Sequence, residues 1–97
     1  MRWEIVLAPE AVEDLRRLSA RHRATIRDAL EQHLRYEPTK VSRSRIKRLR
    51  GLSKPEYRLR VDELRVFYDV RESRVEVLSI VAKSSAAEWL AQRGEQK

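Results

Sequence analysis

The apolar residues at the start of the chain follow first the spacing of a strand and then that of helices. Large apolar residues fill every second position over residues 3–7, which predicts a short strand ended by Pro9. Pro9 fits the first turn of a helix over about residues 9–19, and a second helix is predicted over about residues 22–36. The residues at helical spacing are Ala8, Val12, Leu15 and Leu18 in the first helix and Ile26, Ala29, Leu30, His33 and Leu34 in the second.

Three strand patterns follow one another in the second half of the chain, over residues 56–61, 64–70 and 75–82. Short polar turns separate them, which predicts an antiparallel meander. We place residues 61 and 64 opposite each other, and this sets the register of the first two strands. Because side chains alternate between the faces of a strand, every second residue is expected in the core. The core face is predicted to hold Tyr57, Leu59, Val61, Leu64, Val66 and Tyr68, and the other face Arg58, Arg60, Arg65, Phe67, Leu78 and Ile80.

The segment between the helices and the meander, residues 39–55, has no such periodicity. Serine, glycine and proline interrupt it, so a long loop with at most one helical turn is predicted, and loops of this length are usually functional or disordered. Near the end of the chain, Ser85 and Glu88 match a capping box, which predicts a short helix from Ser85 to Gly94. Residues 95–97 are expected to fray.

Together these elements predict a small single α+β domain over residues 1–97. An N-terminal strand and a helical hairpin pack on the antiparallel meander, and a short C-terminal helix follows. A chain of 97 residues and 11.5 kDa suffices for one hydrophobic core. Cysteine is absent, which excludes a disulfide framework and suits a reducing compartment. The N-terminal apolar run is too short for a signal peptide, so export is not expected.

Basic residues are concentrated in one window of the chain. The net charge is +7, yet residues 40–60 hold nine basic residues against one acid, Glu56, while the rest of the chain sums to −1. Such a localised surplus favours an anionic partner. It is typical of contacts to nucleic-acid phosphates, and an acidic protein segment fits the same charge. The predicted nucleic-acid contacts are Arg43, Arg45, Lys47, Arg48, Arg50 and Lys54.

Two arginines, Arg60 and Arg65, face each other across the predicted ladder. Like charges in this arrangement destabilise a sheet by up to about 1 kcal/mol, so folding alone gives no reason for the pair. A phosphate accepts hydrogen bonds from two guanidinium groups at once, which predicts an anion site. The alternative is two arginines that are solvated or neutralised by nearby acids. Phe67 is expected on the same exposed face, where an aromatic ring beside basic residues is typical of stacking on single-stranded bases.

Residues for other kinds of chemistry are missing. His22 and His33 lie eleven residues apart without further ligands, so no metal site is expected, and His33 is interpreted as a border residue of the apolar stripe. The two glycines do not form a phosphate-binding loop, and no Ser-His-Asp set is present. No cofactor is predicted. An enzyme built on this chain would have to use arginine, lysine and tyrosine.

In its order of elements the chain resembles toxins of the RelE/ParE superfamily, which belong to bacterial and archaeal toxin–antitoxin modules. The most specific segments are Leu49-Arg50-Gly51-Leu52, residues 57–61, residues 64–68 and residues 77–83. The resemblance implies a small cytoplasmic protein that a cognate antitoxin silences by covering its basic face. It also implies one of two activities. The RelE branch cleaves messenger RNA in the ribosomal decoding site without a metal, whereas the ParE branch poisons DNA gyrase.

RelE-like sites use basic residues on the first two meander strands, which here correspond to Arg58, Arg60 and Arg65. Two further family positions depart from the pattern. An arginine after the third strand is replaced by Ser84, which follows Lys83, and a tyrosine in the last helix falls near Leu90. Arginine stabilises negative charge but stays protonated, so Lys83 becomes the predicted proton-transfer group beside the three catalytic arginines.

Three functions therefore stay open on the sequence. The first is a ribosome-dependent messenger-RNA endonuclease (an mRNA interferase), favoured by Lys83 and the three arginines. The second is a gyrase inhibitor with no chemistry of its own. The third is an inactive toxin fold that only pairs with its antitoxin, and the missing arginine and tyrosine leave room for both of these alternatives.

Overall fold

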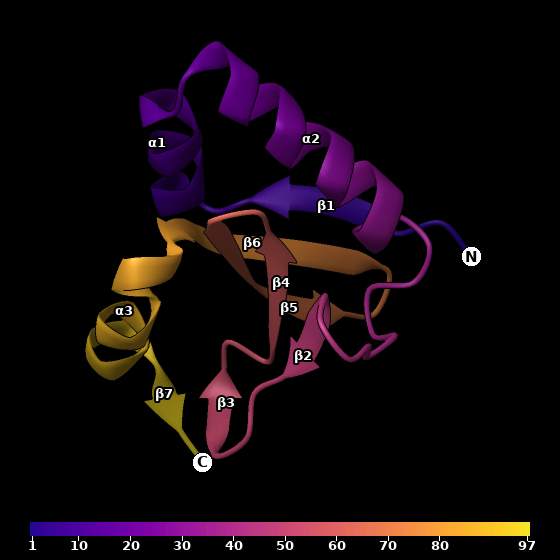
Figure 1. Cartoon of the computed structure of the whole chain (residues 1–97). Coiled ribbons are helices and arrows are strands. Elements are labelled where there is room, and N and C mark those ends of the chain that lie inside the picture. The colour runs from indigo at the N-terminus through magenta and orange to yellow at the C-terminus, as the bar shows by residue number, and fades with distance from the viewer.

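The computed structural model describes residues 1–97 and has a central sheet with helices on both faces (Figure 1). In chain order the elements are β1 Glu4–Leu7, α1 Pro9–Arg17, α2 Ala20–Leu34, β2 Ile46–Arg48, β3 Leu52–Lys54, β4 Tyr57–Val61, β5 Leu64–Arg71, β6 Arg74–Ala82, a 3-10 turn Lys83–Ser85, α3 Ala86–Arg93 and β7 Glu95–Gln96. The five-stranded sheet has the order β1-β6-β5-β4-β2, with β1 parallel to β6 and the other neighbours antiparallel. The predicted α+β class is confirmed.

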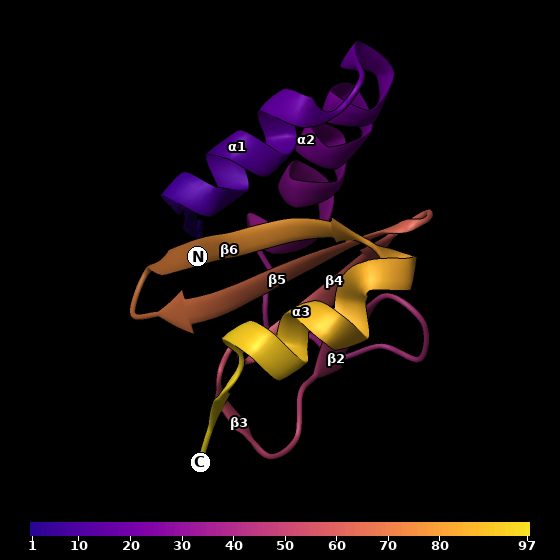
Figure 2. The same ribbon diagram turned by 90° about the vertical axis from the view of Figure 1, so that its left-hand side faces the viewer.

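The two N-terminal helices cover one face of the sheet and α3 lies against the other (Figure 2). The side chain of Ser19 begins α2 by accepting a hydrogen bond from the backbone N–H of His22 at 3.2 Å. The stripe predicted for α2 is buried except for the half-exposed His33. In α1 the core residues are Ala11 and Leu15, whereas Val12 is 39% exposed, so the prediction for Val12 was wrong. The helices are all too short and too polar to traverse a lipid bilayer.

The predicted register of the meander is confirmed, with Tyr57 opposite Tyr68 and Arg60 opposite Arg65. The third strand differs from the prediction, because a bulge near Leu78 adds one residue to β6. The bulge turns Ile80 into the core on the α1–α2 face, so its predicted place beside the arginines was wrong. Leu78 stays on the α3 face.

The predicted loop over residues 39–55 contains two strands and no helical turn. Strand β2 pairs with β4, so the basic segment forms the outer edge of the main sheet. Strand β3 pairs with β7, which means that Glu95 and Gln96 are held in a two-stranded sheet and do not fray (Figure 1). The pattern failed here because strands of two or three residues are too short to show alternation.

Contacts from α1 close the edge of β6 beyond the end of β1. One carboxylate oxygen of Asp14 accepts hydrogen bonds from the hydroxyl of Ser79 at 2.8 Å and from the backbone N–H of Ile80 at 2.9 Å. Ser79 is fully buried and Ile80 is 5% exposed. The carboxylate therefore satisfies two buried donors that the parallel β1 strand does not reach.

Candidate functional site

Two rows of basic side chains cross the outer strands of the sheet on the face that carries α3. Ile46 and Leu59 are register partners with buried side chains, so Lys47, Arg58 and Arg60, which lie beside them on β2 and β4, point to the opposite face. Lys47 is the register partner of Arg58, and the N–H of Arg60 donates to the carbonyl of Arg45 at 2.8 Å. We call these four residues, Arg45, Lys47, Arg58 and Arg60, the basic array. The predicted contacts Arg45 and Lys47 are thus brought beside the predicted catalytic residues Arg58 and Arg60.

No residue of the basic array forms an ion pair with a carboxylate. The ion pairs of the protein use other cations, namely Arg16, Arg35, Lys40, Arg71 and Arg93. Arg58 is half-buried, and its Nε is buried without a hydrogen-bond partner. Burial lowers the pKa of Arg58, and repulsion from Arg65 and Arg60 lowers it further. A bound anion would relieve the repulsion.

Arg65 was predicted on the solvent-facing side of the sheet, and this prediction was wrong. It is only 7% exposed, and its Nη1 donates to the carbonyls of Asp62 and Leu64, each at 2.9 Å. The side chain therefore stabilises the turn between β4 and β5, where Asp62 has a positive φ of 52°. The charge of Arg65 still adds to the positive potential at Arg58. The strand register alone could not show that the guanidinium of Arg65 donates its hydrogen bonds to backbone carbonyls.

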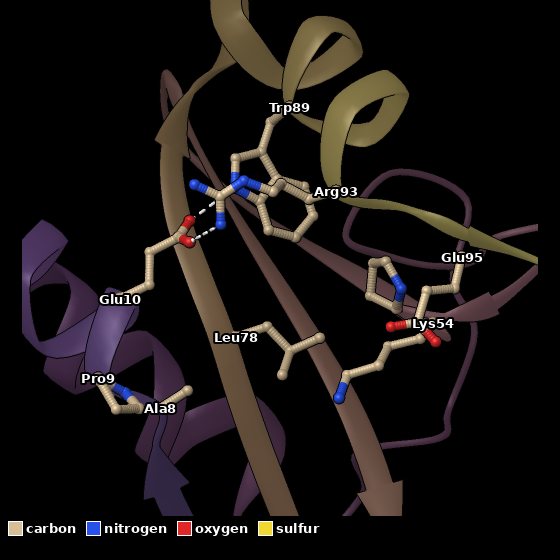
Figure 3. Close-up of a pocket in the computed structure, with 9 residues that line it drawn as sticks. Ala8, Pro9, Glu10, Lys54, Leu78, Trp89, Arg93 and Glu95 are labelled. Atoms are coloured by element: carbon tan, nitrogen blue, oxygen red, sulfur yellow. Dashed lines mark hydrogen bonds and ion pairs between the residues drawn. The ribbon is translucent and has the colours of Figure 1, made fainter.

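Phe67 is fully buried, so the prediction of an exposed base-stacking ring was wrong. The indole of Trp89 covers it, with ring centroids 4.8 Å apart and planes 5° from parallel. The carboxylate of Glu10 holds α3 in this position, because it accepts a hydrogen bond from the Trp89 indole at 2.7 Å and pairs with Arg93 (Figure 3). The predicted capping by Ser85 is also wrong, since its side chain makes no cap hydrogen bond.

Acid is expected to loosen α3 through Glu10. Burial raises the pKa of Glu10, but the hydrogen bond from Trp89 and the charge and hydrogen bond of Arg93 outweigh it, and the net pKa is lowered. Because the pKa of Glu10 is lower in the folded protein than in the unfolded chain, ionised Glu10 stabilises the fold fully above the pKa of the unfolded chain. This stabilisation is lost as the pH falls through the pKa of the folded protein. We expect Trp89 fluorescence in a Trp3→Phe background to change below about pH 4.3, before global unfolding.

In that background, Glu10→Gln cannot ionise and should show no such transition. An unchanged acid transition in this variant would contradict the role of Glu10.

The other predicted site residues are scattered around the basic array. Arg48 turns to the opposite face, where its Nη1 donates to the hydroxyl of Tyr57 at 3.0 Å. Lys54 lies on β3 beside Leu78 and Trp89, in the hollow that Figure 3 shows. Arg43 and Arg50 are exposed on the segments that flank β2. Lys83 is exposed. Its backbone N–H donates to the carbonyl of Glu63 at 2.8 Å, which puts Lys83 next to the turn that Arg65 stabilises.

Two hollows adjoin the outer edge of the sheet, and Arg45 lines both. The first, of about 150 Å³, is lined by Ser44, Arg45, Arg60 and Asp62 without any apolar residue. The second, of about 260 Å³, lies between α2 and the segment before β2 and includes His33 and Arg45. His33 was interpreted from the sequence as a border residue of the stripe. The position of His33 in the helical pattern could not show that the segment before β2 brings Arg45 beside it.

The fold of the chain is similar to folds found in three solved toxin–antitoxin complexes. The RelBE2 toxin–antitoxin complex of Mycobacterium tuberculosis contains a chain of 22% identity with a TM-score of 0.69, covering 84% of this chain and 99% of that one. The archaeal RelE–RelB complex of Pyrococcus horikoshii OT3 gives 25% identity and a TM-score of 0.64 over 86% and 97%. The RelB–RelE complex of Methanococcus jannaschii gives 19% identity and a TM-score of 0.65 over 87% and 96%.

The family itself is shown by the sequence. The family model described as the ParE toxin of the type II toxin–antitoxin system, parDE, matches residues 5–86. The chain therefore belongs to this family and is a RelE/ParE-like toxin of a type II toxin–antitoxin system. No curated protein matches it.

Proposed function

We propose that this toxin inhibits translation by cleaving messenger RNA on the ribosome without a metal ion. The observation that carries the proposal is the basic array, four cations at the outer edge of the sheet with no carboxylate paired to them. Residues Arg58 and Arg60 are two positions apart on β4, about 7 Å. Adjacent guanidinium groups at this spacing suit the phosphates of an extended single strand, which bind basic grooves of this kind.

The chemistry divides between charge stabilisation and proton transfer. The 2′-hydroxyl of the RNA attacks the adjacent phosphorus, and negative charge develops on the phosphate oxygens. Arg45 and Arg60 line one hollow and would hold that charge, with Arg58 beside them. The leaving 5′-oxygen needs a proton, and the exposed ammonium of Lys83 beside the β4–β5 turn is the proposed donor. Arg65 acts by holding that turn, through its two hydrogen bonds to Asp62 and Leu64.

The proposed partners follow from the same face. A cognate antitoxin would silence the toxin by covering the basic array, in keeping with the toxin–antitoxin complexes that share its fold. The proposed target is messenger RNA in the ribosome of the cytoplasm. No cofactor is part of the proposal.

The test is to induce the toxin in cells and map new messenger-RNA 5′ ends against codon position. Cuts in phase with the reading frame, blocked when the antitoxin is co-expressed, are expected. Transcripts that stay intact during growth arrest would contradict the proposal.

A second candidate is inhibition of DNA gyrase, because the matching family model is that of ParE. In this case the basic array would contact an acidic surface of gyrase or its DNA, and no bond in RNA would break. Intact transcripts together with accumulated DNA breaks would select this function. Growth without arrest, together with tight antitoxin binding, would select the inactive module.

A further inference from the structure

The proposed cleavage lacks one group, a base that takes the proton of the 2′-hydroxyl. Arginine stays protonated near neutral pH and is a poor base. Lys83 is assigned to the leaving oxygen, and its ammonium group donates that proton only while it is charged. The attacking 2′-oxygen must come within about 3–3.5 Å of the phosphorus. The base must therefore lie beside the arginines that hold the phosphate.

Asp62 is the acidic residue of the hollow that Arg45 and Arg60 line. It follows β4 directly and begins the turn to β5. The other residue of this turn, Glu63, accepts the backbone N–H of Lys83 at 2.8 Å. Asp62 thus shares its hollow with the arginines proposed to hold the phosphate, and its turn with the residue that Lys83 contacts.

The carboxylate of Asp62 forms no ion pair within the fold. Arg65 donates to the backbone carbonyl of Asp62 at 2.9 Å, which leaves the side chain out of this contact. Asp62 is exposed, so a ligand can reach it. An ionised carboxylate only accepts hydrogen bonds and can receive the proton of a hydroxyl group that enters the hollow.

The turn and the binding of phosphate both fail to explain why an acid stands at position 62. Asp62 has a φ of 52°, in a region that aspartate enters more readily than most residues. Yet Glu72 takes the same place in the turn between β5 and β6 with a φ of 37°, so such a turn does not require aspartate in this protein. In a phosphate site a negative charge weakens binding by repulsion. Participation in the reaction gives the carboxylate a physical role.

We propose that Asp62 is the general base of the RNA cleavage, an inference that rests on the proposed function. The carboxylate of Asp62 takes the 2′-hydroxyl proton, and the 2′-oxygen forms a bond to the adjacent phosphorus. The bond from phosphorus to the 5′-oxygen breaks, and that oxygen takes a proton from Lys83. The products are a 2′,3′-cyclic phosphate and a 5′-hydroxyl end.

The test compares Asp62→Asn with Glu63→Gln in single-turnover cleavage of messenger RNA on purified ribosomes from pH 6.5 to 8.5. Each variant removes one negative charge from the same turn, but Glu63 does not line the hollow, and asparagine tolerates the positive φ of position 62. The wild type and Glu63→Gln should cleave at rates almost independent of pH, because a carboxylate is ionised throughout this range. Asp62→Asn should cleave about 100-fold more slowly at pH 7 and gain about tenfold per pH unit, because hydroxide replaces the missing base.

RNA binding separates this role from a purely electrostatic one. If Asp62 contributes only its negative charge, Asp62→Asn should bind RNA more tightly and cleave at least as fast as the wild type. The proposed base predicts slower cleavage together with RNA binding at least as tight as that of the wild type. The melting temperature of Asp62→Asn should stay within about 3 °C of the wild type, because the exposed side chain forms no ion pair.

The outcomes distinguish the base from the proposed function. If the wild type cleaves and Asp62→Asn matches or exceeds its rate, the assignment of Asp62 is wrong while the proposed function stands. A slower Asp62→Asn whose rate does not rise with pH, or which binds RNA more weakly, also overturns the assignment, because Asp62 would then act in positioning or folding. A wild type that makes no cuts on any ribosome overturns the proposed function and this inference with it.

Discussion

Replacing Arg45 and Arg60 together by alanine is expected to abolish growth arrest and to slow RNA cleavage at least about 100-fold, because both charges of the first hollow are lost. Both side chains are exposed, so the melting temperature should stay within about 3 °C of the wild type. Binding to single-stranded RNA should weaken. The slope of log affinity against log salt concentration should become shallower by about 1.4, since two phosphate contacts are removed.

A matched control removes two positive charges elsewhere. Arg17 and Arg21 are exposed on the helical hairpin and form no ion pair, so Arg17→Ala with Arg21→Ala makes the same change in net charge. This variant should keep both growth arrest and cleavage. An equal loss of activity in the two double variants would show that only total charge matters. Either an equal loss or full activity in both variants would contradict a site at Arg45 and Arg60.

Replacing Asp14 by alanine is expected to destabilise the fold by about 2–4 kcal/mol, because two buried donors lose their acceptor. These are the hydroxyl of Ser79 and the N–H of Ile80. For a domain of this size the loss corresponds to a fall in melting temperature of about 10–20 °C. Thermal denaturation followed by circular dichroism measures it directly.

The isosteric change Asp14→Asn serves as the control, since the amide oxygen accepts hydrogen bonds in the same place. It should cost less than about 1 kcal/mol. The closure of the β6 edge by α1 would be contradicted by an alanine variant that melts as the wild type does. Similarly large losses of stability in both variants would show instead that the negative charge of Asp14, and not its role as a hydrogen-bond acceptor, is required.

Much of the fold could be predicted because local rules act along the chain. Placing residues 61 and 64 opposite each other was enough to pair Arg60 with Arg65, and the pairing is confirmed. The same rule failed at Ile80, because a bulge adds a residue without changing the pattern of apolar positions. It gave no signal for β2, β3 and β7, each of which is shorter than two full periods of alternation.

The candidate site was predictable in its charge but not in its detailed membership. The basic window does hold Arg45, Lys47, Arg58 and Arg60, which lie together. Arg65 and Phe67 also belong to the predicted face, but α3 and the β4–β5 turn remove them from solvent.

By itself the sequence determined which segment is basic and the register of β4 with β5, because side-chain alternation and charge are properties of neighbouring residues. Only the tertiary structure decided which charged side chains form contacts within the fold. Glu10 meets Trp89 across 79 residues of sequence, and Asp14 meets Ser79 across 65. Contacts over such separations depend on how the helices cross the sheet.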